Sequence, residues 1–554
     1  MRKAFLAAFC ALTLAAGKTV AAEGPQNLST AERPQNPPAA EAPPKLIVAV
    51  SVDQFSADLF AEYRGRFTGG FARLLNGVVF PSGYQGHAMT ETCPGHSTIL
   101  TGSRPARTGI IANTWTNPRA KREDKMIYCV EDETVEGSTS SKTTISLVHM
   151  KVPTLGDRLK AVTPETRVAA VAGKDRAAVT MAGHKADETW WWRTDAFQSY
   201  TGRQMPPAIA AANKAVKDRL AAARPAADLP EVCKAYDKDV VISPNLTVGR
   251  GRFARPAGDT ASYPASPDAD VTVLETALAL AREMKLGEGK ATDVLAVGMS
   301  ATDYVGHFYG TAGAEMCIHL LTIDQALGRF FDGLDATGVD YAVVLTADHG
   351  GHDIPERNKE RGIPEGARID GSLAAATVGK KLAEELKIAG PVLWGDALGL
   401  GDFWIDPKLT EAQRASVLKR AVAIYKDHPH VQAVFTRAEI MAAPAPKTPP
   451  DEWTLLERAK ASYDPQRSGD FVIILKPRVM PALQSAKPYT TMHGTAWDYD
   501  RRVPIIFWRK GMTRFEQPLA VETVDILPTL AAMIGLKIPA GEIDGRCLFG
   551  CETR

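Results

Sequence analysis

Acidic and histidine residues follow several β-branched runs of this 554-residue chain. Asp53 follows the run 45–52, Asp303 follows the run 293–299, and Asp348 and His349 follow the run 341–346. Ligands of an open α/β sheet bind beyond the carboxyl ends of its strands, so we expect these side chains to meet at one edge. His307 follows Asp303 by four residues, which puts both on one face of a helical turn. His493 precedes another run, 503–508. Carboxylates and imidazoles are typical zinc ligands, and the pattern therefore predicts a metal site.

A candidate nucleophile lies in the segment 90–102, Thr-Glu-Thr-Cys-Pro-Gly-His-Ser-Thr-Ile-Leu-Thr-Gly. Pro94 suits the first turn of a helix, and this predicts Thr92 as the N-cap. Its hydroxyl would then lie at the positive end of the helix dipole, where a bound metal favours its ionisation. Capping alone would also explain a threonine here. The acidic and histidine residues elsewhere favour the nucleophile.

The order of elements predicts an α/β fold. Strand-like runs, including 167–172 and 503–508, are separated by helical patterns at 154–161, 314–334 and 523–535. Such alternation is typical of helices packed on a mostly parallel sheet. Two longer segments, about 183–290 and 352–492, are predicted as insertions or a cap. The first contains Trp190–Trp192, which we expect to pack within that cap.

The N-terminal residues resemble an export signal. Residues 1–22 combine a basic start, a short apolar run and small residues at a cleavage site, and residues 23–44 form a Pro-rich linker. Residues 45–554 are then the catalytic domain of a periplasmic or secreted protein without a membrane span. The net charge of +1 gives no reason to expect a nucleic-acid partner.

The cysteine count predicts disulfides. Of 7 cysteines, Cys10 lies in the signal, which leaves the even set Cys93, Cys129, Cys233, Cys317, Cys547 and Cys551. An even set in an exported protein indicates paired cysteines, but the spacing does not choose among the pairings. Cys547 and Cys551 are a plausible local pair. We expect a monomer, with a dimer as the alternative.

Four further histidines have other expected roles. His319 lies in an apolar helical pattern and is predicted to be a core residue. His87, His96 and His352 lie in or near the motifs, and we assign them supporting or structural roles.

The segment 90–102 resembles the nucleophile motif of the alkaline phosphatase superfamily. It is most similar to the branch of nucleotide pyrophosphatase/phosphodiesterases and threonine-nucleophile alkaline phosphatases of the PafA and PhoK type. The segments 303–307 (Asp-Tyr-Val-Gly-His), 346–351 (Thr-Ala-Asp-His-Gly-Gly) and 493–505 (His-Gly-Thr-Ala-Trp-Asp-Tyr-Asp-Arg-Arg-Val-Pro-Ile) resemble that branch's metal motifs, in the same order. The resemblance runs from about Lys45 to the C-terminus. It implies a three-layer αβα sandwich with inserted cap segments.

The resemblance also implies a site. One zinc ion would be held by Asp53, Thr92, Asp348 and His349, and a second by Asp303, His307 and His493. Asn113, Lys174 and Arg176 would bind the phosphoryl group, and Thr92 would form a phosphothreonine. An additional Ca²⁺ or Mg²⁺ ion is left open.

The implied activity is hydrolysis of small phosphate monoesters to an alcohol and inorganic phosphate, with a broad range and some activity on diesters. Lys174 and Arg176, in Gly-Lys-Asp-Arg, resemble residues that mark monoesterases, because two cations favour the dianionic monoester. A nucleotide pyrophosphatase/phosphodiesterase is the alternative enzyme, and a metal-dependent phosphate-binding protein is the alternative without turnover. A sulfatase is discounted because the residues after Cys93 lack the Cys-x-Pro-x-Arg pattern.

Overall fold

The computed structural model describes residues 42–140, 142–483 and 489–551. The predicted signal, 1–22, and nearly all of the predicted linker, 23–44, lie outside the described residues, and both stay predictions. None of the helices in the described ranges combines the length and apolar composition that crossing a membrane requires.

A ten-stranded sheet forms the centre of the fold, with the strand order β19-β2-β18-β11-β1-β10-β5-β6-β7 and β20 beside β2. Its middle strands, from β11 to β6, are parallel, whereas β18 is antiparallel to both of its neighbours. The strands are β1 (Leu46–Val52), β2 (Val78–Tyr84), β5 (Val168–Ala172), β6 (Glu188–Arg193), β7 (Ala196–Gln198), β10 (Asp293–Met299), β11 (Tyr341–Thr346), β18 (Arg502–Arg509), β19 (Phe515–Glu516) and β20 (Val521–Glu522). The predicted mostly parallel sheet is confirmed.

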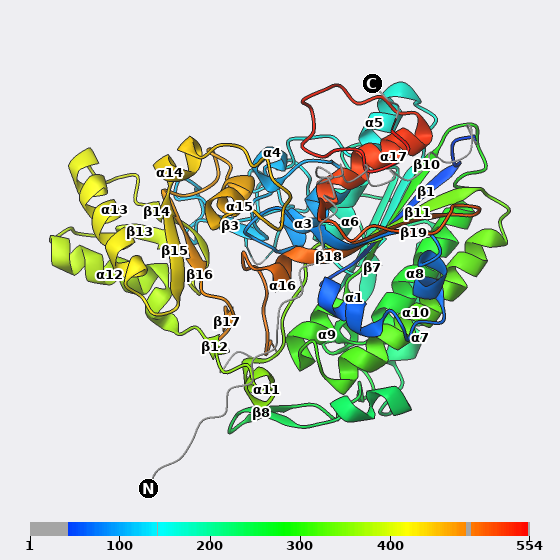
Figure 1. Ribbon diagram of the computed structural model, residues 1–554, viewed down its shortest axis with the longest axis horizontal. Coiled ribbons are helices and arrows are strands. Elements are labelled where there is room, and N and C mark those ends of the chain that lie inside the picture. The colour runs from blue at the N-terminus through cyan, green and yellow to red at the C-terminus, as the bar shows by residue number, and fades with distance from the viewer. Residues whose placement is uncertain (1–41, 141, 484–488, 552–554) are drawn as a thin grey trace, which may run out of the picture. The chain divides into compact units, whose positions relative to one another are not determined.

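Helices cover both faces of this sheet and give three layers (Figure 1). Side chains of β1 alternate between the two cores: Val48 and Val50 belong to one, Ile47 and Ala49 to the other. The first core is shared with α1 (Ala57–Tyr63), α2 (Gly70–Leu74), α7 (Pro207–Leu220), α8 (Pro267–Glu283), α9 (Ala301–Tyr309) and α10 (Ala314–Asp335). The second is shared with α3 (Thr92–Ile99), α5 (Leu155–Val162), α6 (Asp175–Ala182) and α17 (Ile526–Ile534). A strand buried on both faces needs apolar residues throughout, which explains its continuous β-branched run.

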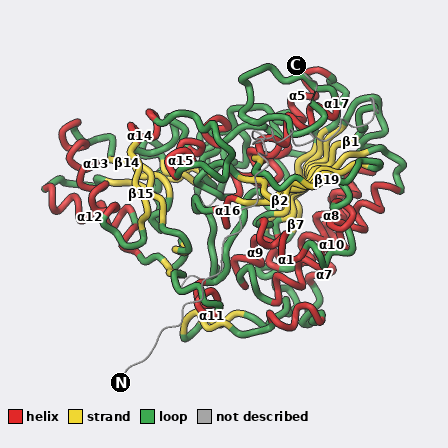
Figure 2. The backbone as a smooth tube through the Cα atoms, viewed as in Figure 1, coloured by secondary structure: helices red, strands yellow, loops and turns green. Residues whose placement is uncertain are grey.

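The second long segment builds a separate antiparallel sheet with its own core (Figure 2). Its strands are β13 (Leu393–Gly395), β14 (Gly401–Ile405), β15 (Val431–Thr436) and β16 (Phe471–Leu475). The helices of this segment are α11 (Pro355–Glu360), α12 (Ala375–Leu386), α13 (Glu411–Lys426), α14 (Arg437–Ala442) and α15 (Leu455–Ser462). Phe403 and Phe471 stack at the centre of the core. The insertion boundaries, about 352 and 492, stay a prediction.

The remaining elements are short. Three strand pairs are β3 (Thr114–Thr116) with β4 (Met126–Tyr128), β8 (Val240–Ser243) with β9 (Leu246–Val248), and β12 (Ala367–Arg368) with β17 (Val479–Met480). The short helices are α4 (Pro105–Thr108) and α16 (Asp498–Arg501).

Trp190–Trp192 lie in the central sheet and not in a cap, which corrects the prediction from the sequence. They form most of β6, which pairs in parallel with β5. Trp190 and Trp191 face opposite cores, and both are buried. The run was missed because a parallel strand usually shows aliphatic β-branched residues. Aromatic residues fit a pleated buried surface equally well.

Three disulfides join the cysteines. They are Cys93–Cys129, Cys233–Cys317 and Cys547–Cys551, so the local pair expected near the C-terminus is formed. The first fastens the start of α3 to the residue after β4.

Candidate active site

Six of the predicted ligands gather in two buried clusters, which we name by their first members. The Asp53 cluster contains Asp53, Asp348 and His349, and the Asp303 cluster contains Asp303, His307 and His493. In each cluster the candidate ligand atoms lie within 4.8 Å of one another. Asp53 follows β1, Asp303 lies in the first turn of α9 after β10, and the Asp348 pair follows β11. Neighbouring parallel strands thus bring together residues almost 300 positions apart, at the edge that the sequence predicts.

Each of the three histidines presents the same nitrogen to its cluster. The Nδ1 atoms lie 2.8 Å from the carbonyl oxygen of Gly350 for His349, 2.6 Å from that of Thr491 for His307, and 2.8 Å from that of Thr90 for His493. A carbonyl oxygen only accepts, so each Nδ1 carries a proton, and each Nε2 is the ring nitrogen that faces the carboxylates of its cluster. This is how metal-binding imidazoles are oriented in proteins.

Several buried acceptor atoms of the Asp53 cluster have no hydrogen-bond partner among the described residues. They include Oδ1 of Asp53 and Nε2 of His349, and Oδ2 of Asp348 joins them except for the His96 ring, whose Nδ1 lies 3.0 Å away. His349 Nε2 lies 3.4 Å from each of these oxygens. Buried acceptors facing one another without a donor are costly, and a cation removes that cost. The donor set of carboxylates and imidazoles therefore fits a metal ion.

The ammonium group of Lys174 lies between the two clusters. Its Nζ is 2.7 Å from Asp53 Oδ2 and 2.5 Å from Asp303 Oδ2. Burial disfavours the charged ammonium, but the charges of Asp303 and Asp53 outweigh it and raise the pKa of Lys174. A positive charge at this position shows that the surrounding carboxylates attract cations.

The pKa shifts of the ligands agree with metal binding. Burial lowers the pKa of His349 to about 3, so the imidazole is neutral. Burial also opposes ionisation of Asp303, but the charges of His307 and Lys174 outweigh it and hold its pKa well below the ordinary value. Burial, with the charge of Asp348, raises the pKa of Asp53. Crowded carboxylates of this kind compete for one proton unless a cation is bound.

Thr92 is the first residue of α3 and is fully buried. The predicted N-cap is corrected to Glu91, because the helix begins one residue earlier than Pro94 suggests. The Oγ1 atom of Thr92 lies 3.4 Å from both Lys174 Nζ and Arg176 Nη2. Gly95 allows the close approach of α3, since a Cβ there would come within 1.9 Å of the Asp348 carbonyl oxygen. The hydroxyl therefore lies beside cations and next to the loop that follows β11.

Asn113 is held to the start of α3. Its Oδ1 accepts a 2.8 Å hydrogen bond from the amide of Cys93, and its own amide donates to Glu91. The amide of Cys129 donates to the Asn113 carbonyl, so the Cys93–Cys129 disulfide reinforces the same contact. Asn113, which the sequence predicted as a site residue, is therefore hydrogen-bonded to the two residues that flank Thr92. Its side-chain oxygen accepts from the Cys93 amide.

Comparison with known proteins identifies the family. Residues 47–498 match the family described as type I phosphodiesterase / nucleotide pyrophosphatase. The chain is 54% identical over 510 residues to alkaline phosphatase PhoK of Sphingomonas sp, a match covering 91% of each chain. It is 47% identical over 510 residues to alkaline phosphatase PhoD of Zymomonas mobilis, covering 91% of this chain and 88% of that protein.

The chain belongs to the type I phosphodiesterase / nucleotide pyrophosphatase family.

The fold agrees with this assignment. The crystal structure of alkaline phosphatase PafA superposes with a TM-score of 0.78 at 24% identity, covering 92% of this chain and 99% of that one. The predicted alkaline-phosphatase-like α/β fold is confirmed. Within the family, the chain is an alkaline phosphatase of the PafA and PhoK type, that is, a phosphoric monoester hydrolase. The alternative of a phosphate-binding protein without turnover is set aside.

Gln54 was missed from the sequence, although it directly follows Asp53. Its backbone amide donates to Asp348 Oδ1 over 3.1 Å, and its Nε2 donates to Asp303 Oδ1 over 2.8 Å. It therefore connects both clusters. Its backbone has a φ of 66°, which is unusual for a residue other than glycine. Its position next to Asp53 at the end of a strand could have indicated a role in the site. The pattern that predicts the site uses only acidic and histidine residues, and glutamine is neither.

His96 contacts the site from inside α3. Its Nδ1 lies 2.9 Å from the Thr92 carbonyl oxygen and 3.0 Å from Asp348 Oδ2. The supporting role assigned to it agrees with these contacts. His87 and His352 are buried, and neither ring has a hydrogen-bond partner among the described residues. His319 is fully buried and contacts Thr302, as expected for a core histidine.

Proposed function

We propose that this alkaline phosphatase hydrolyses phosphate monoesters through a covalent phosphothreonine at Thr92, with two zinc ions held by the Asp53 and Asp303 clusters. The observation that carries the proposal is the position of the Thr92 hydroxyl. It is buried, 3.4 Å from both Lys174 and Arg176, and next to the loop that supplies Asp348. A hydroxyl surrounded by cations is stabilised as an alkoxide.

In the proposed reaction the Thr92 oxygen attacks phosphorus, and the bond from phosphorus to the ester oxygen breaks. The alcohol leaves after taking up a proton from solvent. A water molecule then attacks the phosphothreonine, the bond from phosphorus to Thr92 breaks, and inorganic phosphate is released. Zinc ions bound in the clusters would supply Lewis acids for the attacking and leaving oxygens. Asp53, Thr92, Asp348 and His349 would hold one of them, and Asp303, His307 and His493 the other.

Lys174, Arg176 and Asn113 are proposed to hold the phosphoryl oxygens. A monoester carries one more negative charge than a diester, so the buried Lys174 and the half-buried Arg176 favour the monoester. This is the basis for preferring a monoesterase to a nucleotide pyrophosphatase/phosphodiesterase, with side activity on diesters. Because Oδ1 of Asn113 accepts from the amide of Cys93, the side-chain Nδ2 is the atom that would donate to a phosphoryl oxygen.

Export to the periplasm or outside the cell is part of the proposal. The six paired cysteines support it, because disulfides form and persist in oxidising compartments. Small phosphate esters are the proposed substrates.

The direct test is Thr92→Ala, with Thr92→Ser as the matched control. We expect Thr92→Ala to form no phosphoenzyme when quenched in acid during turnover of a ³²P-labelled monoester, while it still binds two zinc ions. Thr92→Ser keeps a hydroxyl and should still be labelled. Undiminished labelling of Thr92→Ala would place the nucleophile elsewhere.

A further inference from the structure

An open cavity of about 420 Å³ lies beside the two proposed phosphoryl-binding cations. Its lining includes Lys174, Arg176, Tyr304 of α9, Arg193 and Thr194. We call it the Arg193 cavity. Because β6 is parallel to β5, Arg193 at the end of β6 lies at the same sheet edge as Lys174.

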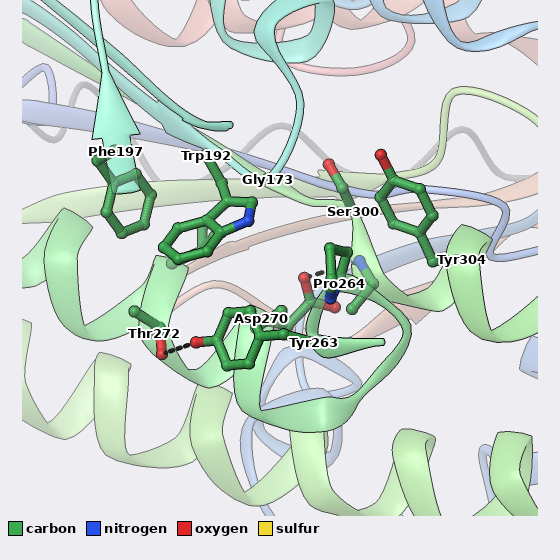
Figure 3. A pocket seen from close by; sticks show the side chains of 12 residues that line it. Gly173, Trp192, Phe197, Tyr263, Pro264, Asp270, Thr272, Ser300 and Tyr304 are labelled. Atoms are coloured by element: carbon green, nitrogen blue, oxygen red, sulfur yellow. Dashed lines mark hydrogen bonds between the residues drawn. The ribbon is translucent and has the colours of Figure 1, made fainter. Parts of the chain in front are cut away.

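The cavity borders a small aromatic recess. Trp192, Tyr304, Gly173 and Pro264 line both. Figure 3 shows the recess with Trp192 and Phe197 near each other and Tyr304 on the opposite side. Its volume of about 10 Å³ is that of a single water site. The recess is therefore too small for a substrate, and the larger cavity is the space available beside the phosphoryl-binding residues.

Two hydrogen-bond donors of this cavity have no acceptor among the described residues. The guanidinium of Arg193 makes no ion pair or hydrogen bond there. Trp192 is only 8% exposed, and its indole Nε1 is also unpartnered. In Figure 3 that nitrogen is on the side of the ring that faces Ser300 and Tyr304. The indole nitrogen faces the water-sized recess, where a water molecule can accept from it. The half-buried guanidinium of Arg193 lines the larger cavity and is left to bind an anion there.

The balance of charge in the cavity is positive. Lys174, Arg176 and Arg193 line it together with one acid, Asp175. Oδ1 of Asp175 already accepts from the Tyr128 hydroxyl over 2.6 Å and from the Arg176 amide over 2.7 Å. The guanidinium of Arg193 is thus the cation of the lining that has no partner within the described residues.

The turn that carries these residues is strained. Thr194 and Asp195 join β6 to β7, and Thr194 has a φ of 61°. The first position of such a two-residue turn usually takes glycine when φ is positive, and a β-branched residue is an outlier there. The chain accepts this strain and keeps a threonine at the rim of the cavity. Strained positions of this kind gather at ligand sites.

We propose that the Arg193 cavity binds a second anionic group, a carboxylate or a phosphate, on the alcohol part of the phosphate monoester. Arg193 supplies the charge, and the Thr194 hydroxyl at the rim adds a hydrogen bond. The proposal rests on the proposed function, in which Lys174 and Arg176 hold the reacting phosphoryl group. It assigns a substrate class: organic phosphates that carry a further negative charge.

The test compares phenyl phosphate with 3- and 4-carboxyphenyl phosphate and with 1,4-phenylene bisphosphate. For each substrate kcat and KM are measured with the zinc-loaded wild type, Arg193→Ala and Arg193→Lys. We expect Arg193→Ala to lower the ratio of kcat/KM for the charged substrates to kcat/KM for phenyl phosphate by about tenfold, mainly through KM, because a charge-assisted contact is lost. Comparing this ratio between each variant and the wild type cancels the differences in leaving-group chemistry between the substrates. The carboxylate and bisphosphate arms show which anion is preferred.

Two further variants serve as checks. Lys217→Ala removes an exposed positive charge of α7 that does not line the cavity, and the ratio should stay at its wild-type value. Trp192→Phe removes an N–H that faces the recess and not the cavity, and the ratio should stay close to its wild-type value. Melting temperatures confirm that the variants are folded.

The outcomes separate the two proposals. An unchanged ratio in Arg193→Ala, with wild type active on phenyl phosphate, overturns the subsite and leaves the proposed function intact. An equal fall in Lys217→Ala also overturns it, because the effect is then net charge. Activity that survives in Thr92→Ala overturns the proposed function instead.

Discussion

At the scale of single residues, the site depends on which atom of each side chain is left free. Backbone carbonyl oxygens hold Nδ1 of His307, His349 and His493, and this leaves Nε2 for a metal ion. The spacing of these histidines in the sequence says nothing about the choice, since the carbonyls belong to Thr491, Gly350 and Thr90.

Lys174 and Arg176 should decide between monoesters and diesters. We expect the double variant Lys174→Ala with Arg176→Ala to lose about 100-fold or more in kcat/KM for a phosphate monoester, the scale of losing preorganised donors. The loss for a diester with the same leaving group should be much smaller, because a diester carries one charge fewer. Parallel kinetics on both substrates measures this. Equal losses would contradict the proposed role and favour a phosphodiesterase.

Gln54 should support both clusters without binding an ion itself. Gln54→Ala removes the hydrogen bond to Asp303, and we expect zinc affinity to fall by about 10- to 100-fold, as is typical when a supporting partner of a ligand is lost. Competition with a chromogenic chelator measures the affinity. Gln54→Glu, which keeps the length of the side chain but not its donor, is the matched control and should also weaken binding. Unchanged affinity in both variants would show that Asp303 needs no such partner.

At the scale of elements, α9 is fixed at its N-terminus by a buried carboxyl group of α8. Asp270 is 1% exposed, and its Oδ1 accepts a 3.0 Å hydrogen bond from the amide of Ala301. Oδ2 lies 3.6 Å from Nε2 of His319, which belongs to α10. The carboxyl group of α8 therefore holds the start of α9 below the turn that carries Asp303, while His319 Nε2 is hydrogen-bonded to Thr302.

This contact predicts a pH dependence of stability. Burial raises the pKa of Asp270 to about 7, whereas a carboxyl in the unfolded chain titrates near 3.9. Between these values the folded state binds more protons than the unfolded state, so the free energy of unfolding falls as pH rises, and it stays level above about 7. Asp270→Asn has no carboxyl group to ionise here, so its free energy of unfolding should not fall in this way. We expect the difference in free energy of unfolding, variant minus wild type, to increase by about 2–4 kcal/mol from pH 4 to 7.

Denaturant unfolding of chelated protein at several pH values measures this difference. The two proteins should show a constant difference above pH 7. Parallel profiles from pH 4 to 7 would mean that Asp270 ionises normally in the folded protein.

At the scale of the whole molecule, the site joins segments from most of the chain. The clusters take residues from position 53 to position 493, and buried carboxylates from three strand ends lie around one ammonium. Without bound metal these carboxylates repel one another in the folded protein, whereas water solvates them in the unfolded chain.

Metal removal should therefore lower the melting temperature. Ligands that bind only the folded state stabilise by about 2.7 kcal/mol at 100-fold their Kd. For two zinc ions in a chain of this size we expect a rise of about 5 °C over the chelated protein, increasing with zinc concentration. Scanning calorimetry checks it. Asp303→Asn, which weakens one cluster, should show a smaller rise, and no difference between loaded and chelated wild type would argue against both sites.

The amino-acid pattern alone predicts the alternating fold and the metal-binding residues, and the family resemblance implies their division into two clusters. Long β-branched runs report strands buried on both faces, and polar residues just after them must lie at the carboxyl edge of a parallel sheet. Asp53, Asp303 and Asp348 follow from this local rule. The disulfide pairing, the place of Trp190–Trp192 in the sheet and the role of Gln54 did not follow from it.

Those features become visible in the folded chain, because they depend on the distance between segments that are far apart in sequence. Cys93 and Cys129 are paired because β4 lies beside the start of α3, and no local pattern reports that contact. Gln54 matters because its amide group reaches Asp303, 249 residues away. Arg193 is likewise an ordinary strand-end arginine in the sequence, and it faces a cavity only because β6 lies beside β5.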